Sequence, residues 1–419
     1  MKKHFLKFLA IASLAIIGCQ TETIENSNEE SSILNKNIAI SATFTQTESS
    51  PIKGQYIVIL NNGVFNKATN GKGIVNYESA KKSFMSQSIE KFSNAKLEKS
   101  SIINAYGFAL EGFTAKLNDA QLKVLKNDPR VSSIEQDYYV VQNFPAIKAK
   151  PAGVGNGGGN AAQEVPYGIT RVGGGQVYTG SKTAWVIDSG IDLDHPDLNV
   201  DAARSASYVT SGGGSSPDDQ HGHGTHVAGT IGAIDNSIGV VGVAAGVNVV
   251  AVRVVDRRGS GAASWCVSGV DYVAANAQAG DVANMSLGYP ANPSIDQAVI
   301  NASNLGIEFA LAAGNDGANA ATGPSPSPAR VNGANIYTVS AMDINDNFAS
   351  FSNYGEPPVD YCAPGVAVKS CWKGAGYSTI SGTSMASPHM AGLLIWGNVS
   401  TSGFVNGDPD GNPDPIAHR

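Results

Sequence analysis

TAWVID at residues 183–188 and VNVVAVRVV at 247–255 are two of five short apolar segments that decide the fold. Each segment is apolar throughout instead of alternating with polar residues, which is typical of a strand buried on both faces. Segments with helical periodicity, such as 264–277 and 295–305, lie between them. The pattern predicts an α/β domain in which helices flank a parallel sheet. The other three segments are DVANMSL at 281–287, IEFALAAGN at 307–315 and IYTVSAM at 336–342.

Chemically useful residues stand where these strands end, which is the edge at which parallel sheets bind ligands. Asp188 ends a buried strand, and a buried carboxylate needs hydrogen-bond partners. We interpret Pro388 as a first-turn proline, which places Ser384 near a helix N-terminus. The four segments that carry these residues are WVIDSG at 185–190, HGHGTHVAG at 221–229, AAGNDG at 312–317 and SGTSMASPH at 381–389.

The four segments together contain the groups of one mechanism. A serine such as Ser384 is a weak nucleophile until a histidine takes its proton, and a buried aspartate such as Asp188 can hold that histidine in the right tautomer. Asn315, with the backbone N–H of Ser384, could stabilise the oxyanion of a tetrahedral intermediate. The pattern therefore indicates nucleophilic hydrolysis, although residues alone leave open which histidine is the base.

These segments resemble those of the subtilases, the subtilisin and proteinase K family of serine endopeptidases, over roughly residues 163–400. The chain order Asp188, His223, Ser384 is the subtilisin order. The family string H-G-T-H-V-A-G begins at His223, and its first histidine is the catalytic one. The serine segment G-T-S-M-A differs from the G-x-S-x-G of α/β-hydrolases. The resemblance implies that Asp188 orients, His223 acts as base and then acid, Ser384 attacks, and Asn315 donates to the oxyanion.

The same resemblance implies a substrate cleft. His226 is expected to be a packed helix residue and His221 a loop residue. The resemblance further implies a broad preference for large apolar or aromatic P1 residues. Separately, the acidic side chain of Asp316 is expected to favour basic residues weakly at the rim of the first pocket. One wall would be the substrate-pairing strand with Ser286, Leu287 and Gly288, and the facing wall Ala313 and Gly314.

A calcium site is expected beside the histidine segment, because residues 234–240 resemble the calcium loop of subtilisin. Carbonyl and carboxylate oxygens suit a hard cation such as Ca²⁺. Asp360 resembles the acidic ligand of a second, weaker site. The positions that match the first, structural site are Gln163, Asp197, Ile234, Asn236, Ile238 and Val240.

Residues 51–144 have the pattern of a separate small domain. Strands are predicted at 55–60, 108–117 and 131–141, with helices at 78–97 and, capped by Asn118, at 119–128, which suits a β-α-β-β-α-β unit. This region resembles the inhibitor-type propeptide of subtilases. The resemblance implies a ferredoxin-like α+β fold, a role as folding chaperone and intramolecular inhibitor, and self-cleavage between Gln142 and Ala162.

Other boundaries follow from composition. Residues 145–162 are rich in Pro, Gly and Ala and predict a linker before the peptidase domain, 163–419. Residues 1–18 have the charged start and apolar core of a signal peptide, and the segment before Cys19 resembles a bacterial lipobox. An ordinary signal peptide is the alternative. Residues 19–50 predict a disordered tether.

The expected localisation follows from that order. Lipid on Cys19 would anchor only the precursor to a bacterial envelope membrane, and the mature enzyme would be released as a secreted protein. Cys362 and Cys371, nine residues apart, could close a local disulfide after export. Cys266 is expected to be a small buried residue.

Composition excludes several classes. The net charge of −7 argues against nucleic-acid binding, and the 42% hydrophobic content argues against a disordered chain. We expect protein or peptide substrates, the chain's own propeptide as inhibitor, and a monomer. After His389 the family pattern thins, and residues 405–419 are polar, so the last subtilisin helices are expected to be missing. Two alternatives stay open: a non-catalytic subtilase-like binding protein, and a zinc hydrolase using His221, His223 and His226.

Overall fold

The computed structural model describes residues 48–66, 74–142, 144, 162–210, 214–397 and 399–419. All of these residues belong to one compact unit, 42–419. The predicted signal peptide, Cys19, and nearly all of the predicted tether and linker lie outside the described residues. Among the described residues, no helix is both long and apolar enough to cross a membrane.

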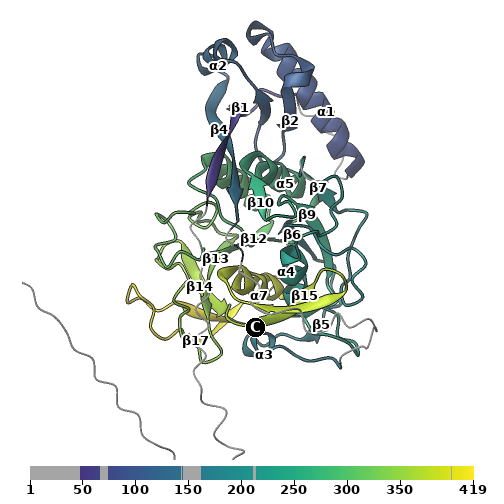
Figure 1. Ribbon diagram of the computed structural model, residues 1–419, viewed down its shortest axis with the longest axis vertical. Coiled ribbons are helices and arrows are strands. Elements are labelled where there is room, and N and C mark those ends of the chain that lie inside the picture. Colours follow the sequence, from purple (N-terminus) through teal and green to yellow (C-terminus); the bar gives the residue numbers. More distant parts are fainter. Residues whose placement is uncertain (1–47, 67–73, 143, 145–161, 211–213, 398) are drawn as a thin grey trace, which may run out of the picture. The chain divides into compact units, whose positions relative to one another are not determined.

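The first part of this unit has two helices and four strands in the expected β-α-β-β-α-β order (Figure 1), although the strand at 102–106 was not among the strands that the sequence predicted. The four strands form an antiparallel sheet, and a fifth strand, Ser260–Ala262 of the second part, extends it beside the strand at 131–141. Helix α2 begins with a capping box in which Asn118 accepts from the Gln121 amide, as the sequence predicted. β1 starts at Ser49, so the end of the predicted disordered tether is ordered strand. The elements are β1 (Ser49–Leu60), α1 (Ile74–Lys91), β2 (Ile102–Tyr106), β3 (Gly112–Lys116), α2 (Asp119–Lys126) and β4 (Val131–Val141), with 3₁₀ turns at Ser93–Ala95 and Lys99–Ser101.

The second part is built on a nine-stranded sheet, and its neighbouring strands are parallel except for the antiparallel pair at one edge. The predicted parallel α/β sheet is therefore confirmed. In spatial order the strands are β17 (Ser400–Phe404), β18 (Pro415–His418), β14 (Val359–Pro364), β13 (Ile336–Met342), β12 (Glu308–Ala312), β11 (Val282–Met285), β6 (Thr183–Asp188), β9 (Asn248–Arg253) and β7 (Ala206–Ser207).

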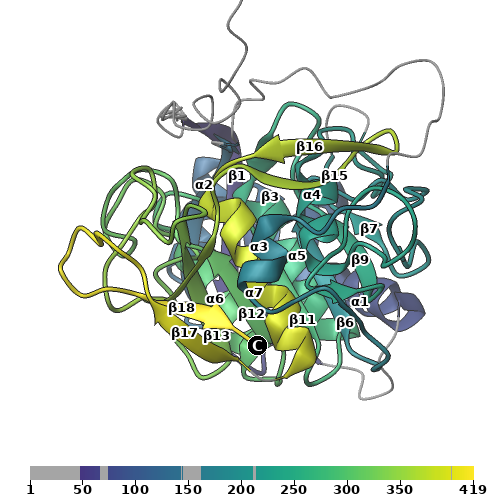
Figure 2. The same cartoon turned by 90° about the horizontal axis from the view of Figure 1, so that it is seen from below.

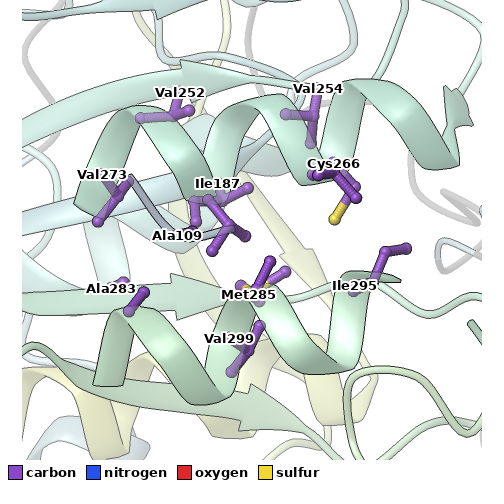
Figure 3. Packing of buried hydrophobic residues seen from close by; sticks show 14 of the residues in the cluster. Ala109, Ile187, Val252, Val254, Cys266, Val273, Ala283, Met285, Ile295 and Val299 are labelled. Carbon is purple, nitrogen blue, oxygen red and sulfur yellow. The ribbon is translucent and has the colours of Figure 1, made fainter. Parts of the chain in front are cut away.

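Helices cover both faces of this sheet. In β6, Trp185 and Ile187 pack into the cluster formed with α5 and α6, whereas Ala184 and Val186 pack into the cluster formed with α4 and α7. Figure 3 shows side chains of α5 and α6 directed toward Ile187 and the strands. The helices are α3 (Tyr167–Arg171), α4 (His223–Gly232), α5 (Ala263–Asn276), α6 (Pro293–Ser303) and α7 (Thr383–Trp396).

Short strands complete the domain. The hairpin of β15 and β16 packs along α4 (Figure 2). After α7 the chain forms the β17–β18 hairpin at the sheet edge, where the guanidinium of Arg419 lies 3.7 Å from the ring centre of Trp396. The remaining short strands are β5 (Gln176–Val177), β8 (Ala244–Ala245), β10 (Ser260–Ala262), β15 (Val368–Trp372) and β16 (Gly376–Ile380).

One prediction about α7 is wrong: Pro388 is not in the first turn but inside the helix, five residues after Thr383. A proline has no N–H for the carbonyl four residues back, which here belongs to Ser384. The hydroxyl of Ser286 donates to that carbonyl at 2.9 Å instead. The proline is therefore tolerated because a neighbouring strand end supplies the missing donor.

The predicted disulfide is also wrong, because Cys362 and Cys371 are free and buried. Cys362 packs with Met342 in a cluster at the β14 edge, whereas Cys371 packs in the cluster of α4 and α7. The two thiols thus belong to different parts of the core despite their short sequence separation. Cys266 is buried in α5, as expected.

Candidate active site

The centre of the site is a buried histidine–aspartate pair. His223 Nδ1 lies 2.8 Å from Asp188 Oδ1 and 3.0 Å from Oδ2, and both side chains are fully buried. The Ser189 amide donates to Asp188 Oδ1 at 2.7 Å. Asp188 ends β6, so the carboxylate reaches the edge of the sheet where the strand stops. This pair fixes the imidazole with Nδ1 as the donor and leaves Nε2 for chemistry.

The loop before His223 is held by Asp219, a residue that sequence reasoning missed. Asp219 Oδ1 accepts from the His221 and Gly222 amides, both at 2.8 Å, and Oδ2 accepts from the Thr225 hydroxyl at 2.7 Å. Burial raises the pKa of this carboxyl. Its position two residues before His221 is the sequence feature that could have identified Asp219 as part of the site.

Close packing explains one glycine of the H-G-T-H string. A Cβ at Gly224 would lie 2.1 Å from the Gly190 carbonyl oxygen and 3.2 Å from Asp188 Cβ. Any larger residue would push the first turn of α4 away from β6. The glycine therefore lets His223 approach Asp188.

Ser384 is the second residue of α7 and is 4% exposed. Its hydroxyl lies 3.3 Å from the Ser286 carbonyl, to which it donates. His223 Nε2 is buried and has no hydrogen-bond partner among the described residues. The predicted nucleophile is thus near the helix N-terminus, as expected, but its hydroxyl faces the β11 end.

Asn315 is fixed by the residue before the predicted nucleophile. Its Oδ1 accepts from the Thr383 amide at 2.8 Å and from the Thr383 hydroxyl at 2.9 Å. The Thr383 hydroxyl in turn accepts from the Gly314 amide at 3.1 Å. Because the side-chain oxygen is occupied, the Nδ2 amide is the donor that Asn315 can offer. Sequence reasoning missed this role of Thr383.

A small cavity of about 30 Å³ lies beside Ser384. Four of the five predicted substrate residues line it, and Ala313 does not. Ala313 is fully buried with Ala320 and Val359 instead, because successive side chains leaving β12 point to opposite sides. The cavity lining comprises Gln142, Phe144, Ser286, Leu287, Gly288, Ala312, Gly314, Asn315, Asp316, Ser325, Thr383 and Ser384.

The end of the small domain lies in this cleft. The Phe144 ring stacks on the His223 imidazole with ring centres 3.7 Å apart and planes 23° apart. The Gln142 amide donates to the Gly259 carbonyl at 2.7 Å. The Gln142 side-chain oxygen accepts from the Gly288 amide at 3.0 Å. A segment of the chain itself therefore covers the imidazole and the cleft.

Two further contacts fasten the small domain to α5. Asp271 Oδ1 accepts from the Phe108 and Ala109 amides, both at 2.7 Å, and from the Gly107 amide at 3.2 Å. Asp137 Oδ1 accepts from the Ser264 amide at 3.1 Å, in the first turn of α5. β10 also pairs antiparallel with β4. These contacts use carboxylates and backbone amides that motif reading does not single out.

The other two histidines have separate surroundings. His226 Nε2 lies 3.1 Å from the Val368 carbonyl, and burial lowers the pKa of this imidazole to about 3. Burial, and next the neighbouring His223, lower the pKa of His221 to about 4. Within the ranges that the structure describes, His, Cys, Asp and Glu side chains form no group of three suited to a metal. The three rings thus do not converge as zinc ligands.

The six predicted calcium ligands do cluster. Asp197 is fully buried; its Oδ1 accepts from Asn236 Nδ2 at 2.8 Å and its Oδ2 from the Val240 amide at 3.0 Å. Gln163 Nε2 donates to the Ile234 carbonyl at 2.9 Å. Burial raises the pKa of Asp197. One buried carboxylate among amide and backbone carbonyl oxygens fits a hard cation such as Ca²⁺.

Ile238, the last position of the first predicted calcium site, and Asp360, the acidic position of the second, have different surroundings. The Ile238 amide donates to the Asn236 side-chain oxygen at 2.7 Å, which closes the loop. Asp360 accepts from the Thr338 amide at 2.8 Å and lines a hollow with Glu356. Burial raises the pKa of Asp360 to about 6. The hollow is open, so a cation there would be held more loosely than one at Asp197.

Two family profiles match this chain. The profile of the "Subtilase family" matches residues 184–395, and that of "Peptidase inhibitor I9" matches residues 55–141. The matched ranges correspond to the nine-stranded domain and the small antiparallel domain.

Known proteins agree with these matches. The chain is 40% identical over 320 residues to alkaline serine exoprotease A of Vibrio alginolyticus, which covers 74% of this chain and 55% of that protein. It is 40% identical over 285 residues to subtilisin E of Bacillus subtilis (strain 168), which covers 66% of this chain and 68% of that protein. A crystal structure of a cold adapted subtilisin-like serine proteinase superposes with a TM-score of 0.51 at 37% identity, covering 60% of this chain and 97% of that one.

Proposed function

This chain belongs to the subtilase family of serine endopeptidases, and on that premise we propose that it is a zymogen whose Ser384 cleaves peptide bonds through an acyl-enzyme. One observation carries the proposal: a buried His223–Asp188 pair at the sheet edge where Ser384 and Asn315 also lie. That pair provides a base held in one tautomer beside a serine at a helix N-terminus.

The steps follow from these positions. The Ser384 hydroxyl turns from the Ser286 carbonyl toward His223 Nε2, gives up its proton there and attacks the substrate carbonyl carbon. The Asn315 Nδ2 amide and the backbone N–H of Ser384 receive the oxyanion. His223 then protonates the leaving amine, Asp188 stabilises the imidazolium, and water removes the acyl group by the same steps in reverse.

The substrate main chain would lie between the edge of β10 and residues 286–288, with the P1 side chain in the cavity beside Ser384. The cavity carries one acidic group, Asp316, whose pKa is raised by burial. We propose a broad preference for large apolar or aromatic P1 residues in proteins and peptides, with basic residues tolerated at that rim.

Residues 51–144 would act as the chain's own inhibitor, and their end would be cut between Gln142 and Ala162. The stacking of Phe144 on His223 favours a bond next to Phe144. Cutting there separates the inhibitor domain from the peptidase domain, 163–419. The pairing of β4 with β10 would keep the cut propeptide bound for a time.

Calcium would be structural, held by the buried carboxylate of Asp197, the side chains of Gln163 and Asn236, and the carbonyls of the 234–240 loop. Removing it leaves that carboxylate without a cation and the loop easier to open. We expect excess EDTA to lower the Tm of the Ser384→Ala variant by several degrees. Asp197→Asn should lower the Tm without EDTA and make it insensitive to EDTA.

Export would place the enzyme outside the cell, with lipid on Cys19 anchoring only the precursor. Cutting beside Phe144 would then release a soluble mature enzyme. The mass of the N-terminal peptide of the precursor shows whether Cys19 carries a lipid, and the Cys19→Ala variant is the control. Lipid on the mature enzyme would contradict this release.

The experiment that tests the function compares wild type with Ser384→Ala by intact mass over time. We expect wild type to shorten by the mass of the propeptide and the variant to stay full length. A serine-directed phosphonylating reagent should abolish casein cleavage, whereas activity lost at once to a chelator and spared by the reagent would favour the zinc hydrolase. If wild type and Ser384→Ala both stay full length and neither cleaves casein, the result favours the non-catalytic, subtilase-like binding protein.

A further inference from the structure

The first strand of the described unit extends beyond the inhibitor family match. That match begins at residue 55, but β1 begins at Ser49. Residues 48–51, called the strap below, pair with the last residues of β4, and the Val141 amide donates to the Glu48 carbonyl at 3.0 Å. The strap therefore lies against the same strand end that leads into the cleft.

The course of the strap is fixed by a bulge at residues 52–55. The Gln136 side-chain amide donates to the Ile52 and Gln55 carbonyls, both at 2.8 Å. The Gln55 side chain donates to Asp137 Oδ2 at 2.6 Å. Because Asp137 also accepts from the first turn of α5, the bulge is tied to the peptidase domain as well as to β4.

The end of β4 is consequently the middle strand of three. On one edge the Gln142 amide donates to the Gly259 carbonyl at 2.7 Å, and Val140 lies opposite Gly261 of β10. On the other edge the Val141 amide donates to the strap. Successive amides of an antiparallel strand point to opposite sides, so both edges of the tail are hydrogen-bonded.

We propose that the strap is a latch that keeps the tail of the propeptide extended and so slows its departure from the cleft after cutting. This rests on the proposed role of residues 51–144 as inhibitor. A tail already held as a strand loses less conformational freedom when it pairs with β10, and a preorganised segment dissociates more slowly. The strap adds no contact to Ser384 or His223 and leaves the cutting step unchanged.

Proline substitution tests the latch. The bond from Val141 to Glu48 makes Ser50 and Tyr139 the next hydrogen-bonded pair of the ladder. Ser50→Pro in the full chain removes that amide donor, and Ser27→Pro, ahead of the strap, is the matched control. We measure two times: the appearance of cut chain by mass, and the lag until a peptide substrate is hydrolysed.

We expect Ser50→Pro to shorten the lag about tenfold, which corresponds to about 1.4 kcal/mol, while the cutting rate changes less than twofold. Ser27→Pro should match wild type in both times. Equal lags for all three proteins overturn the latch. If wild type itself is never cut, the proposed function fails, and that result is distinct from cut chains with equal lags.

A second measurement does not depend on activity. In the Ser384→Ala background, hydrogen–deuterium exchange of the peptide spanning 138–142 reports the pairing of the tail. We expect faster exchange there in Ser50→Pro, and a smaller increase in Gln136→Ala, which loses only the support of the bulge. Exchange that stays at the wild-type rate in Ser50→Pro contradicts the latch even if the lag changes.

Discussion

Asp188 and Asp271 are two buried carboxylates that hold two different regions together. Asp188 accepts from His223 and from the Ser189 amide, both in its own domain. Asp271 accepts from three successive amides of the small domain, residues 107–109. Each satisfies the same requirement, that a buried carboxylate must find donors. The catalytic region satisfies it permanently, whereas the inhibitor contact satisfies it only while the propeptide stays.

This contrast explains how a precursor can be tightly closed and yet separate into two domains. Asp271 is 1% exposed with the small domain in place. We expect departure of that domain to expose this carboxylate to water. Water then replaces the three amides, so the net gain from the contact is modest. No such exchange is open to Asp188, whose partners share its core. The inhibitor contact should therefore be tunable by mutation, and the catalytic pair should not.

The largest effect should come from breaking the catalytic pair. Asp188→Asn keeps the shape but presents an amide to His223 Nδ1 and favours the wrong tautomer. We expect kcat to fall about 10⁴-fold on a peptide substrate, with KM changed little, in enzyme matured by adding wild-type protease. A loss of less than tenfold would mean that Asp188 does not orient the base.

The next effect concerns Asn315, which Thr383 holds through its side-chain oxygen. Asn315→Leu removes the Nδ2 donor, and we expect kcat to fall about 10²- to 10³-fold. Thr383→Val keeps the donor but loosens it, so we expect a smaller loss. If Asn315→Leu lowers only substrate affinity, the side chain binds substrate in the ground state instead.

Breaking the inhibitor contact should have a smaller effect. Asp271→Asn leaves one oxygen acceptor but removes the charge that three amides share, at a cost of roughly 1.5–3 kcal/mol. We expect the separately added propeptide to inhibit roughly 10- to 100-fold less tightly, with kcat unchanged. Glu90→Gln, at an exposed position of α1, is the control and should leave inhibition as in wild type. Equal inhibition by both variants would show that β4 pairing alone holds the propeptide.

The sequence was a good guide wherever chemistry requires a particular residue type at a strand end. Asp188, His223 and Asn315 lie where the strand-end segments predicted, and Asp197 lies with the loop predicted to share its cation. Periodicity also predicted the parallel sheet and the small domain. A short segment is enough for these predictions because each strand or helix forms from consecutive residues and shows its own periodicity.

What could not be predicted depends on contacts between distant segments. Pro388 was placed in the first turn because nothing local shows that Ser286 supplies the missing donor. The Cys362–Cys371 disulfide followed from spacing, but side-chain direction separates the two thiols. The contact of Phe144 with the His223 imidazole and the pairing of the strap with β4 each join distant segments, and no sequence motif predicts either contact.

The smallest expected effect concerns Asp414, a buried carboxylate with few hydrogen-bond donors around it. Burial, and then repulsion from Asp408, raise the pKa of Asp414 to about 7, above the unfolded value of about 3.9. Folding therefore favours the protonated form, and that stabilisation is complete below about pH 4 and lost as pH rises through 7. Asp414→Asn in Ser384→Ala protein should raise the Tm by about 2–4 °C at pH 8 and by nothing at pH 4. The control variant Asp410→Asn, at an exposed neighbouring position, should change the Tm less. Asp188 and Asp271 accept from several donors, whereas the hydroxyl of Ser340 is the side-chain donor to Asp414. A lower Tm of Asp414→Asn at pH 8 would therefore mean that this one hydroxyl is enough to stabilise the Asp414 anion.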